Sequence, residues 1–258
     1  MQDINLPQAK VIEEKENYGK IVIEPLFPGY GYTVGNAIRR VLISSLPGAA
    51  ITSVKIEDVA HEFSTIPGVK EDVIEIMMNL KKIRLKLFGD EAVTLKLQAT
   101  GPKEIKAKDI KTPSQVEIKN KDLYIATLDK AKAKLNMEMV VERGRGYEAA
   151  ENRAGKSSIG TIQIDSIFSP VTWVNCTVEN MRVGQRTDYH RVILEIKTDG
   201  TITPVEAFKS AVAILMEQFS VLKDIEGEKK TPEKKLPSTA KKDEKKVTKK
   251  KRSAKSVA

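Results

Sequence analysis

Short runs in which apolar and polar residues alternate are the feature of this sequence that most constrains its fold. Most of these runs put their apolar side chains on one face, which is typical of half-buried antiparallel strands. Only three segments between them have helical periodicity, so the pattern predicts an α+β fold rather than a βαβ repeat. The runs cover residues 20–26, 51–57, 83–88, 93–100, 133–142, 159–167 and 191–197.

Two of the three predicted helices are amphipathic segments in the first third of the chain. In the first, Thr33 is the expected N-cap, and Pro47 with Gly48 stops the helix. In the second, which lies within residues 70–82, the carboxylates of Glu71, Asp72 and Glu75 indicate a solvated face. The apolar stripes are Val34, Ile38, Val41 and Leu42 in the first, and Val73, Ile76, Met77 and Leu80 in the second.

The third predicted helix, residues 203–225, carries the clearest start signal. Thr203 is the expected cap, Pro204 occupies the first helical position, and Glu206 completes a capping box. Its apolar band is wider than one sheet face requires, so we expect the helix to pack against a second partner as well. The band consists of Phe208, Ala211, Val212, Leu215, Phe219 and Leu222, widened by Ala207, Ile214 and Val221.

The net charge of +9 is confined to the end of the chain. From Gly227 onward there are 13 basic and four acidic residues, so this segment accounts for the whole excess and residues 1–226 are neutral. A high isoelectric point therefore does not indicate a nucleic-acid groove in the folded body. The segment is rich in Lys, Pro and Ser with few apolar residues, which predicts a disordered basic tail.

Cysteine usage and hydropathy limit the compartment. Cys176 is the only cysteine, which excludes an internal disulfide and fits a reducing cytosol. No apolar run approaches the ~18–20 residues that span a bilayer. Residues 1–20 lack the pattern of a secretory signal. We therefore expect a cytoplasmic protein with no membrane partner.

Motifs that would indicate catalysis are incomplete. The stretch GYGYTVG at 29–35 places its third glycine one position late for a dinucleotide fingerprint, so we interpret it as a tight turn entering a helix. HEFST at 61–65 has Thr65 where a zinc protease needs a second histidine. His61, His190 and Cys176 are too few for a closed zinc site. The sequence thus predicts no catalytic, metal or cofactor site.

One further run, ERGRGY at 142–147, permits two interpretations. Two arginines alternate with two glycines ahead of a tyrosine. The simpler interpretation is a surface hairpin turn. The alternative is a loop that directs charged hydrogen bonds to carboxylates or phosphates of a partner.

Taken together, these segments resemble the N-terminal region of the bacterial RNA polymerase α subunit. The similar stretches occur in order over residues 20–225, which is harder to produce by chance than one short motif. GNAIRR followed by SSLPG, and GQRTD followed by DGTI, are the most specific pieces. The stretches are residues 24–48, 61–81, 141–147, 169–171 and 182–208.

The resemblance implies a homodimeric, non-catalytic scaffold on which the β and β′ subunits of a nucleotidyltransferase assemble, with ω and σ joining in the holoenzyme. Residues 1–47 and 171–226 would form a dimerisation subdomain, residues 48–170 an inserted β-rich subdomain, and 227–258 the tail. By the resemblance, the dimer interface would include Ile38, Val41, Leu42, Phe208, Val212, Leu215 and Phe219.

The resemblance also assigns the contacts with the large subunits. Arg40 matches the arginine that serves β binding in the family, and Arg39 points about 100° away from it on a helix. The loop residues Ser64, Thr65, Gly68 and Val69 would also face β, whereas β′ would meet Lys81, Arg182 and Arg191.

The sequence departs from the family at its end. The family usually continues into a small helical C-terminal domain that binds promoter DNA, but here a lysine-rich tail ends at Ala258. We therefore do not carry over the contacts of that domain. Two interpretations of the tail stay open: a sequence-independent electrostatic tether to upstream DNA through Lys249, Lys250, Lys251 and Arg252, and a solubilising tail with no target.

Two other functions are weighed against this one. The first is an archaeal or eukaryotic α-like assembly subunit, but Cys176 alone cannot ligate the cluster that some of these subunits carry. The second is a basic nucleic-acid-binding protein acting through its tail. A neutral body and a tail without interleaved aromatic residues argue against sequence-specific binding.

Overall fold

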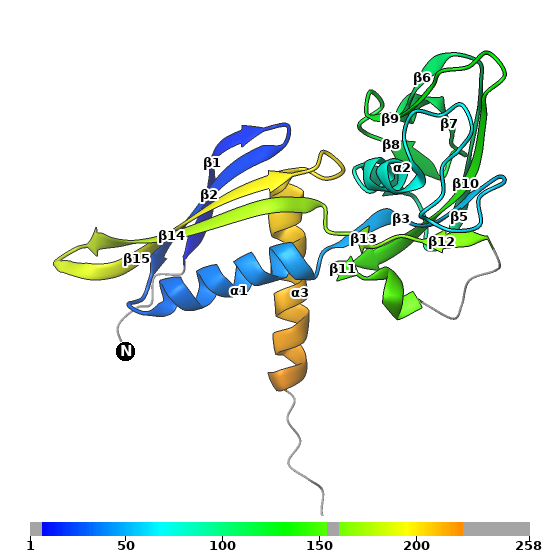
Figure 1. The fold of residues 1–258 in the computed structure, drawn as a ribbon. Helices are drawn as coiled ribbons and strands as arrows, with labels where there is room; N and C mark the ends of the chain where they lie inside the picture. The colour runs from blue at the N-terminus through cyan, green and yellow to red at the C-terminus, as the bar shows by residue number, and fades with distance from the viewer. Residues whose placement is uncertain (1–6, 154–159, 224–258) are drawn as a thin grey trace, which may run out of the picture. The chain divides into compact units, whose positions relative to one another are not determined.

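The computed structural model describes residues 7–153 and 160–223, whose strands form two large sheets and two small strand pairs (Figure 1). The first sheet has four antiparallel strands in the order β1 (Gln8–Lys15), β2 (Tyr18–Leu26), β15 (Arg186–Thr198) and β14 (Val171–Val183). Helix α1 (Tyr30–Ser44) packs against β14 and β15, and α3 (Pro204–Lys223) ends the described chain. We call these six elements the platform.

The second sheet has seven strands. Its path runs β7 (Ile110–Lys111), β5 (Val93–Thr100), β10 (Lys134–Arg145), β3 (Pro47–Ile56), β4 (Leu85–Leu87) and β8 (Val116–Ile118). β12 (Thr161–Gln163) pairs with β3 off this path. Two smaller pairs are β6 (Lys103–Lys106) with β9 (Tyr124–Leu128), and β11 (Tyr147–Glu148) with β13 (Ser166–Ile167). With helix α2 (Val73–Leu80), these strands form the insert.

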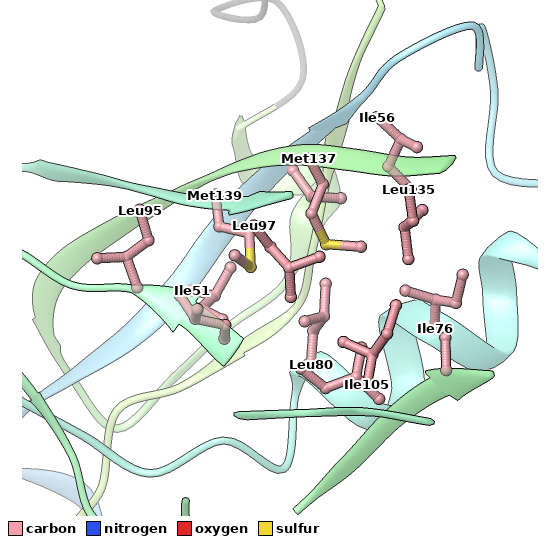
Figure 2. Close-up of a cluster of buried hydrophobic side chains, with 14 of the residues drawn as sticks. Ile51, Ile56, Ile76, Leu80, Leu95, Leu97, Ile105, Leu135, Met137 and Met139 are labelled. Atoms are coloured by element: carbon pink, nitrogen blue, oxygen red, sulfur yellow. The ribbon is translucent and has the colours of Figure 1, made fainter. Parts of the chain in front are cut away.

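The platform and the insert have separate hydrophobic cores. The insert core joins the inner faces of β3, β5 and β10 to one side of α2, as Figure 2 shows for Ile51, Leu97, Met139, Leu80 and Ile76. The platform core joins α1 and the start of α3 to residues of β2, β14 and β15. No buried residue belongs to both clusters. The predicted α+β class with antiparallel sheets is confirmed.

Every predicted strand segment contains a strand, but the short insert strands β6, β7, β8, β9 and β11 and two platform strands escaped prediction. β1 is exposed along almost its whole length, and β14 is half exposed, because each lies at an edge of the four-stranded sheet. Edge strands bury little, so their apolar signal is weak. The prediction of one strand over 159–167 was too coarse, because that segment holds β12 and β13 as separate strands.

The predicted start of the first helix was wrong. α1 begins at Tyr30, three residues before Thr33, and its N-cap is Gly29 with φ of 88°. Gly31 and Gly35 therefore lie inside the helix rather than in a turn. A Cβ at Gly31 would lie 2.8 Å from the Val178 side chain, and one at Gly35 would lie 2.6 Å from Cys176 Sγ. These glycines let α1 approach β14 more closely than any other residue would allow.

Of the other two helices, only α3 had a predicted start, and Asp72 lies at the N-cap of α2 rather than on its solvated face. In α2, Asp72 is the N-cap and accepts a hydrogen bond from the Glu75 backbone N–H at 2.7 Å. In α3, the Thr203 hydroxyl accepts from the Glu206 N–H, while the Glu206 carboxylate accepts from the Thr203 N–H. This reciprocal pair confirms the predicted capping box. No helix in the described residues is long and apolar enough to cross a membrane.

Candidate subunit-contact surfaces

The second half of α3 carries the largest uncovered apolar surface among the platform helices. Near its start, Ala207 and Ala211 are fully buried against the platform core. Further along, the side chains leave that core and become exposed: Met216 68%, Phe219 60%, Val221 70% and Leu222 59%. Contiguous exposed apolar residues of this size mark an interaction surface.

The residues predicted for a dimer interface divide into three groups in the structure. Ile38 and Leu42 are buried, because they face the chain's own sheet. Val41, Phe208, Val212 and Leu215 are partly buried at the margin of the platform core. Phe219 alone among the predicted residues is largely exposed. The free apolar surface therefore begins where the platform core ends.

Two neighbouring arginines near the middle of α1 point in different directions. Arg39 follows Gly35 by one turn and lies at the side of the buried stripe that Gly31, Gly35, Ile38 and Leu42 form. The Arg39 guanidinium lies close enough to act electrostatically on the Cys176 thiol, whose pKa is raised by burial and lowered less strongly by this positive charge. Arg40 lies about 100° further round the helix. Both side chains are exposed.

The loop before α2 is held in place at several points. Its backbone pairs with β9 through Val69 and Leu128 and closes on itself through a bridge between Thr65 and Asp72. The Ser64 carbonyl accepts a hydrogen bond from the Val73 N–H at 3.3 Å. The predicted contact residues Ser64, Thr65, Gly68 and Val69 are thereby brought together on one ordered loop.

Glu71 anchors this loop, contrary to the prediction that it belongs to a solvated helix face. Glu71 is 8% exposed, and its carboxylate accepts hydrogen bonds from the Tyr124 hydroxyl and from the Thr127 backbone N–H, the latter at 2.7 Å. The Lys70 N–H donates to the Thr127 carbonyl next to it. A buried carboxylate needs such partners, and strand β9 supplies them. The sequence offered no signal for this role, because the partners are more than 50 residues away.

Lys81, at the end of α2, already has a partner within the chain. Its Nζ donates to Asp165 Oδ2 at 2.9 Å, and Asp165 also accepts from the Ala150 backbone N–H at 2.9 Å. The Ala150 hydrogen bond and then Lys81 hold the pKa of Asp165 below its ordinary value. Lys81 therefore fixes the segment that follows β11, in addition to any contact with a partner.

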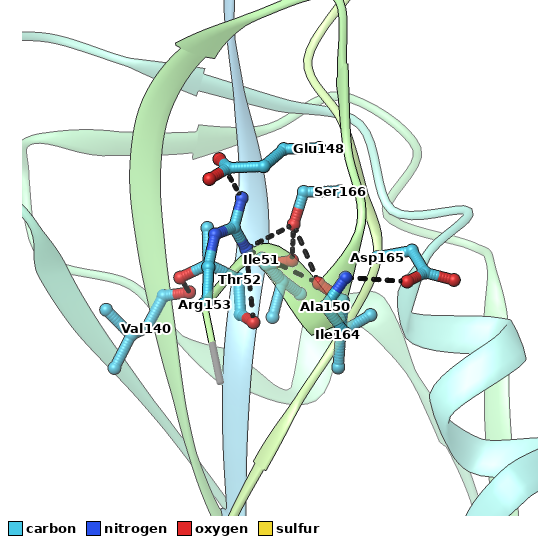
Figure 3. Close-up of polar contacts among 9 residues, drawn as sticks. All are labelled: Ile51, Thr52, Val140, Glu148, Ala150, Arg153, Ile164, Asp165 and Ser166. Carbon is cyan, nitrogen blue, oxygen red and sulfur yellow. Dashed lines mark hydrogen bonds and ion pairs between the residues drawn. The ribbon is translucent and has the colours of Figure 1, made fainter. Parts of the chain in front are cut away.

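Arg153 is the centre of a second polar cluster in the same segment (Figure 3). It donates to the Glu148 carboxylate and to Ser166 Oγ at 3.1 Å, and its guanidinium lies over the Phe168 ring with 5.7 Å to the centroid. Ser166 Oγ in turn reaches the Ile51 carbonyl at 3.0 Å. The cluster joins β3, β11 and β13 at the point where the chain returns toward the platform.

The other two predicted β′-facing arginines lie on the platform sheet and differ in their partners. Arg191 Nε donates to Glu24 Oε2, and Lys10 Nζ lies 3.7 Å from Glu24 Oε1. Arg182 is exposed and donates only to the Gly184 carbonyl, at 2.8 Å, among the contacts of the described chain. Arg182 thus keeps most of its hydrogen-bonding capacity for another molecule.

The ERGRGY run is not the hairpin turn of the simpler interpretation. β10 continues through Arg145 and pairs with the start of β3, where Gly144 lies opposite Gly48. Only Gly146, with φ of 65°, makes a turn, which leads into β11. Arg143 forms an ion pair with Asp90 on the surface.

Residues 7–153 and 160–223 contain no group of three or more His, Cys, Asp or Glu side chains placed to hold a metal ion. The predicted tail contacts at Lys249, Lys250, Lys251 and Arg252 lie outside the described residues, as does the predicted disorder of the tail.

Comparisons with known proteins give a consistent result. The sequence family described as the RNA polymerase Rpb3/RpoA insert domain matches residues 54–169. The chain is 52% identical over 224 residues to a protein of Roseiflexus sp. (strain RS-1), covering 87% of this chain and 69% of that one. It is 54% identical over 222 residues to a protein of Carboxydothermus hydrogenoformans, covering 86% and 71%. Both relatives are named DNA-directed RNA polymerase subunit alpha.

Proposed function

Because the chain belongs to the family of DNA-directed RNA polymerase α subunits, we propose that it acts as a homodimeric scaffold on which the large β and β′ subunits assemble. It is part of a nucleotidyltransferase complex, and in this proposal it contributes no catalytic group of its own. The chemistry of RNA synthesis belongs to the large subunits, and the α dimer brings them together in the cytoplasm.

The observation that carries the proposal is the uncovered apolar end of α3. Met216, Phe219, Val221 and Leu222 are exposed in the isolated chain although they continue the stripe that fills the platform core. Burying a Phe or Leu side chain contributes about 1.5–3 kcal/mol. In a symmetric dimer, the same side chains of a second copy would cover this surface. Each buried side chain then contributes twice, once from each protomer, as in any isologous interface.

We further propose the division of labour within the chain that the resemblance implies. Residues 1–47 and 171–226 dimerise, and the inserted residues 48–170 present contacts to a large subunit. Two features support this division. The hydrophobic cores are separate, and the insert-domain family matches residues 54–169.

For β binding, Arg40 and the loop of Ser64, Thr65, Gly68 and Val69 are the proposed contacts. The Arg40 side chain is exposed and makes no hydrogen bond or ion pair among the described residues, whereas the Arg40 backbone carbonyl accepts a hydrogen bond from the Ser44 hydroxyl. The loop is ordered before any partner arrives, because Glu71 and β9 hold it. Preorganised contacts lose little conformational entropy on binding.

For β′ binding, Arg182 is the strongest of the three proposed residues, because Lys81 and Arg191 are already paired with Asp165 and Glu24. In this proposal, Lys81 and Arg191 also contact β′, and their ion pairs with Asp165 and Glu24 persist in the complex. Arg39 also stays a proposed contact with a large subunit.

A crossed pair of variants tests the scaffold function. Arg40→Ala should retain the dimer and β′ capture but weaken capture of β, whereas Arg182→Ala should do the reverse. Each variant serves as the control for the other, because both remove one exposed arginine. Loss of a charged contact that becomes desolvated in the complex costs roughly 2–5 kcal/mol. The measurement is co-purification of each tagged large subunit with the full chain.

Two outcomes would reject the proposal. A wild-type chain that remains monomeric at micromolar concentration in sedimentation would reject the homodimer. Undiminished capture of both large subunits by folded forms of both variants would remove the two arginines from the contact sites. Circular dichroism establishes that each variant is folded.

The expected DNA tether through Lys249 to Arg252 stays a separate prediction. A run of lysines can neutralise phosphates without reading bases, so its contribution should fall steeply with salt. Polymerase assembled with α ending at Ile225 should lose promoter occupancy at low salt only on templates with upstream duplex. An equal loss on short and long templates would indicate another partner for the tail.

A further inference from the structure

The outer edge of β14 has no strand beside it in the part of the chain that the structure describes. β14 is 13 residues long and forms the end of the four-stranded sheet, pairing only with β15. Its backbone therefore presents unpaired N–H and C=O groups along the side away from β15. A long open edge of this kind is a template for another strand, and proteins usually protect it.

The other edges of both sheets are protected. β1, at the opposite end of the same sheet, carries Lys10, Glu13, Glu14 and Lys15, and its pairing with β2 shifts register between Val11 and Glu13. The ends of the main path of the seven-stranded sheet, β7 and β8, have two and three residues. Charge, irregularity and short length are the known ways to prevent edge pairing.

The centre of β14 has little of this protection. Its sequence VTWVNCTVENMRV contains no proline and no lysine, and Glu179 is the one charged residue between Trp173 and Met181. Over that stretch the register with β15 is unbroken, with shifts only at the two ends of the strand. Residues such as Val174, Thr177 and Val178 favour strand conformation. The edge is thus long, regular and ready to pair.

Arg39 lies near the centre of β14. It follows Gly35 by one turn of α1, at the side of the stripe that seats this helix on β14, and its charge acts on Cys176 in the centre of the strand. The side chain is exposed and has no hydrogen bond or ion pair among the described residues. A free guanidinium at the side of an open edge is suited to a carboxylate on an added strand.

We propose that the outer edge of β14, together with Arg39, receives an extended acidic segment of one of the large polymerase subunits as a fifth strand of the platform sheet. This inference rests on the proposed scaffold function. The backbone edge supplies affinity, as in other cases of strand addition. Arg39 favours a segment whose carboxylate points to the same face of the sheet as α1, because the two opposite charges then meet.

A second copy of the chain fits this edge less well. Pairing two copies through β14 would bring the second Arg39 toward the first, and like charges brought together at an interface are unfavourable. The proposed dimer also uses a different surface, the exposed end of α3. The β14 edge of each protomer is therefore left for a different chain.

Hydrogen exchange of the full-length protein tests the proposal directly. Amide protons of Val174–Met181 that point away from β15 should exchange rapidly in the free dimer and at least tenfold more slowly in the assembled core enzyme. Amides at the outer edge of β1 should keep the same rate in both states. They form the matched control, because they lie at the other edge of the same sheet.

Either of two results would overturn the inference. If the β14 amides exchange equally fast in the dimer and in the assembled core, no strand is added there. If they are already protected in the α dimer alone, the occupant is a second copy. Failure of the scaffold function is distinguishable, since no core enzyme would then assemble to be measured.

A charge reversal tests the role of Arg39. Arg39→Glu should leave the dimer intact and weaken capture of one large subunit by roughly tenfold, because it places like charges together. Lys132→Glu, the same reversal at an exposed position of the insert, should have no effect. Undiminished capture by the folded Arg39→Glu dimer would contradict the acidic character of the partner segment.

Discussion

The insert and the platform use amphipathic helices in opposite ways. In the insert, α2 buries Val73, Ile76 and Leu80 in a core that the same chain completes. In the platform, α3 fills the core with its first half, whereas its second half leaves Phe219 and Leu222 exposed. Both regions expose single apolar side chains, such as Phe63 in the insert, but α3 alone among these two helices continues its buried stripe into an exposed apolar run. This exposed run is the part of the platform that we propose a second molecule covers.

The largest test of this contrast is Phe219→Ser. Each buried Phe contributes about 1.5–3 kcal/mol, and both protomers carry the change. The dimer should therefore be weakened by about 3–6 kcal/mol. Sedimentation over a concentration series should give monomers at micromolar protein. Phe63→Ser is the matched control, because Phe63 is 76% exposed on the insert and should not affect the dimer. A Phe219→Ser dimer as tight as the wild type would remove α3 from the interface.

The reverse test truncates the insert core. Ile76→Ala creates a cavity in the insert, where Ile76 is 0% exposed, and should lower the free energy of unfolding by about 2–5 kcal/mol. Because the cores share no buried residue, the dimer should persist under native conditions. Urea unfolding followed by hydrogen exchange separates the two regions. Equal loss of protection in both regions would show that they unfold as one unit.

A third change probes the junction between the regions. Arg153→Lys keeps the positive charge but removes the fork that reaches Glu148 and Ser166 together, so a stability loss of about 1–3 kcal/mol is expected. The loss should appear in β11 and β13 first, as faster hydrogen exchange. Lys132→Arg, an exposed change of the same kind, provides the baseline. Unchanged exchange in both strands would mean that the cluster contributes nothing to their order.

The smallest effect is the pH dependence of the Lys81–Asp165 pair. The pKa of Asp165 is lowered in the folded chain, so its contribution is complete above its ordinary value of 3.8 and is lost as the pH falls through the lowered pKa. The stability difference between wild type and Asp165→Asn should therefore be constant near neutral pH and shrink in acid. Thermal unfolding at a series of pH values measures it. If the stability difference between the two proteins persists to the lowest pH, it arises from packing and not from the charge of Asp165.

The sequence predicted the elements whose signals are local. The capping box at Thr203 and Glu206 and the stripe of α2 are confirmed, because spacing of a few residues specifies them. The start of α1 was wrong, since Gly31 and Gly35 resemble turn residues unless the neighbouring strand is known.

The contact surfaces were only partly predictable for the same reason. Helical periodicity marked Leu42 and Phe219 alike, although one is buried in the chain and the other is exposed. Burial of Glu71 depends on β9, more than 50 residues away. Contacts between distant segments decide these cases, and a single sequence does not display them.

The glycine seat of α1 has a consequence for symmetry. Gly31 and Gly35 seat α1 directly on β14, and this packing sets the position of Arg39 and Arg40 on the platform of each copy of the chain. In the proposed assembly, two identical protomers therefore offer the same arginines to two different large subunits. The difference between the two contacts then has to come from the large subunits themselves.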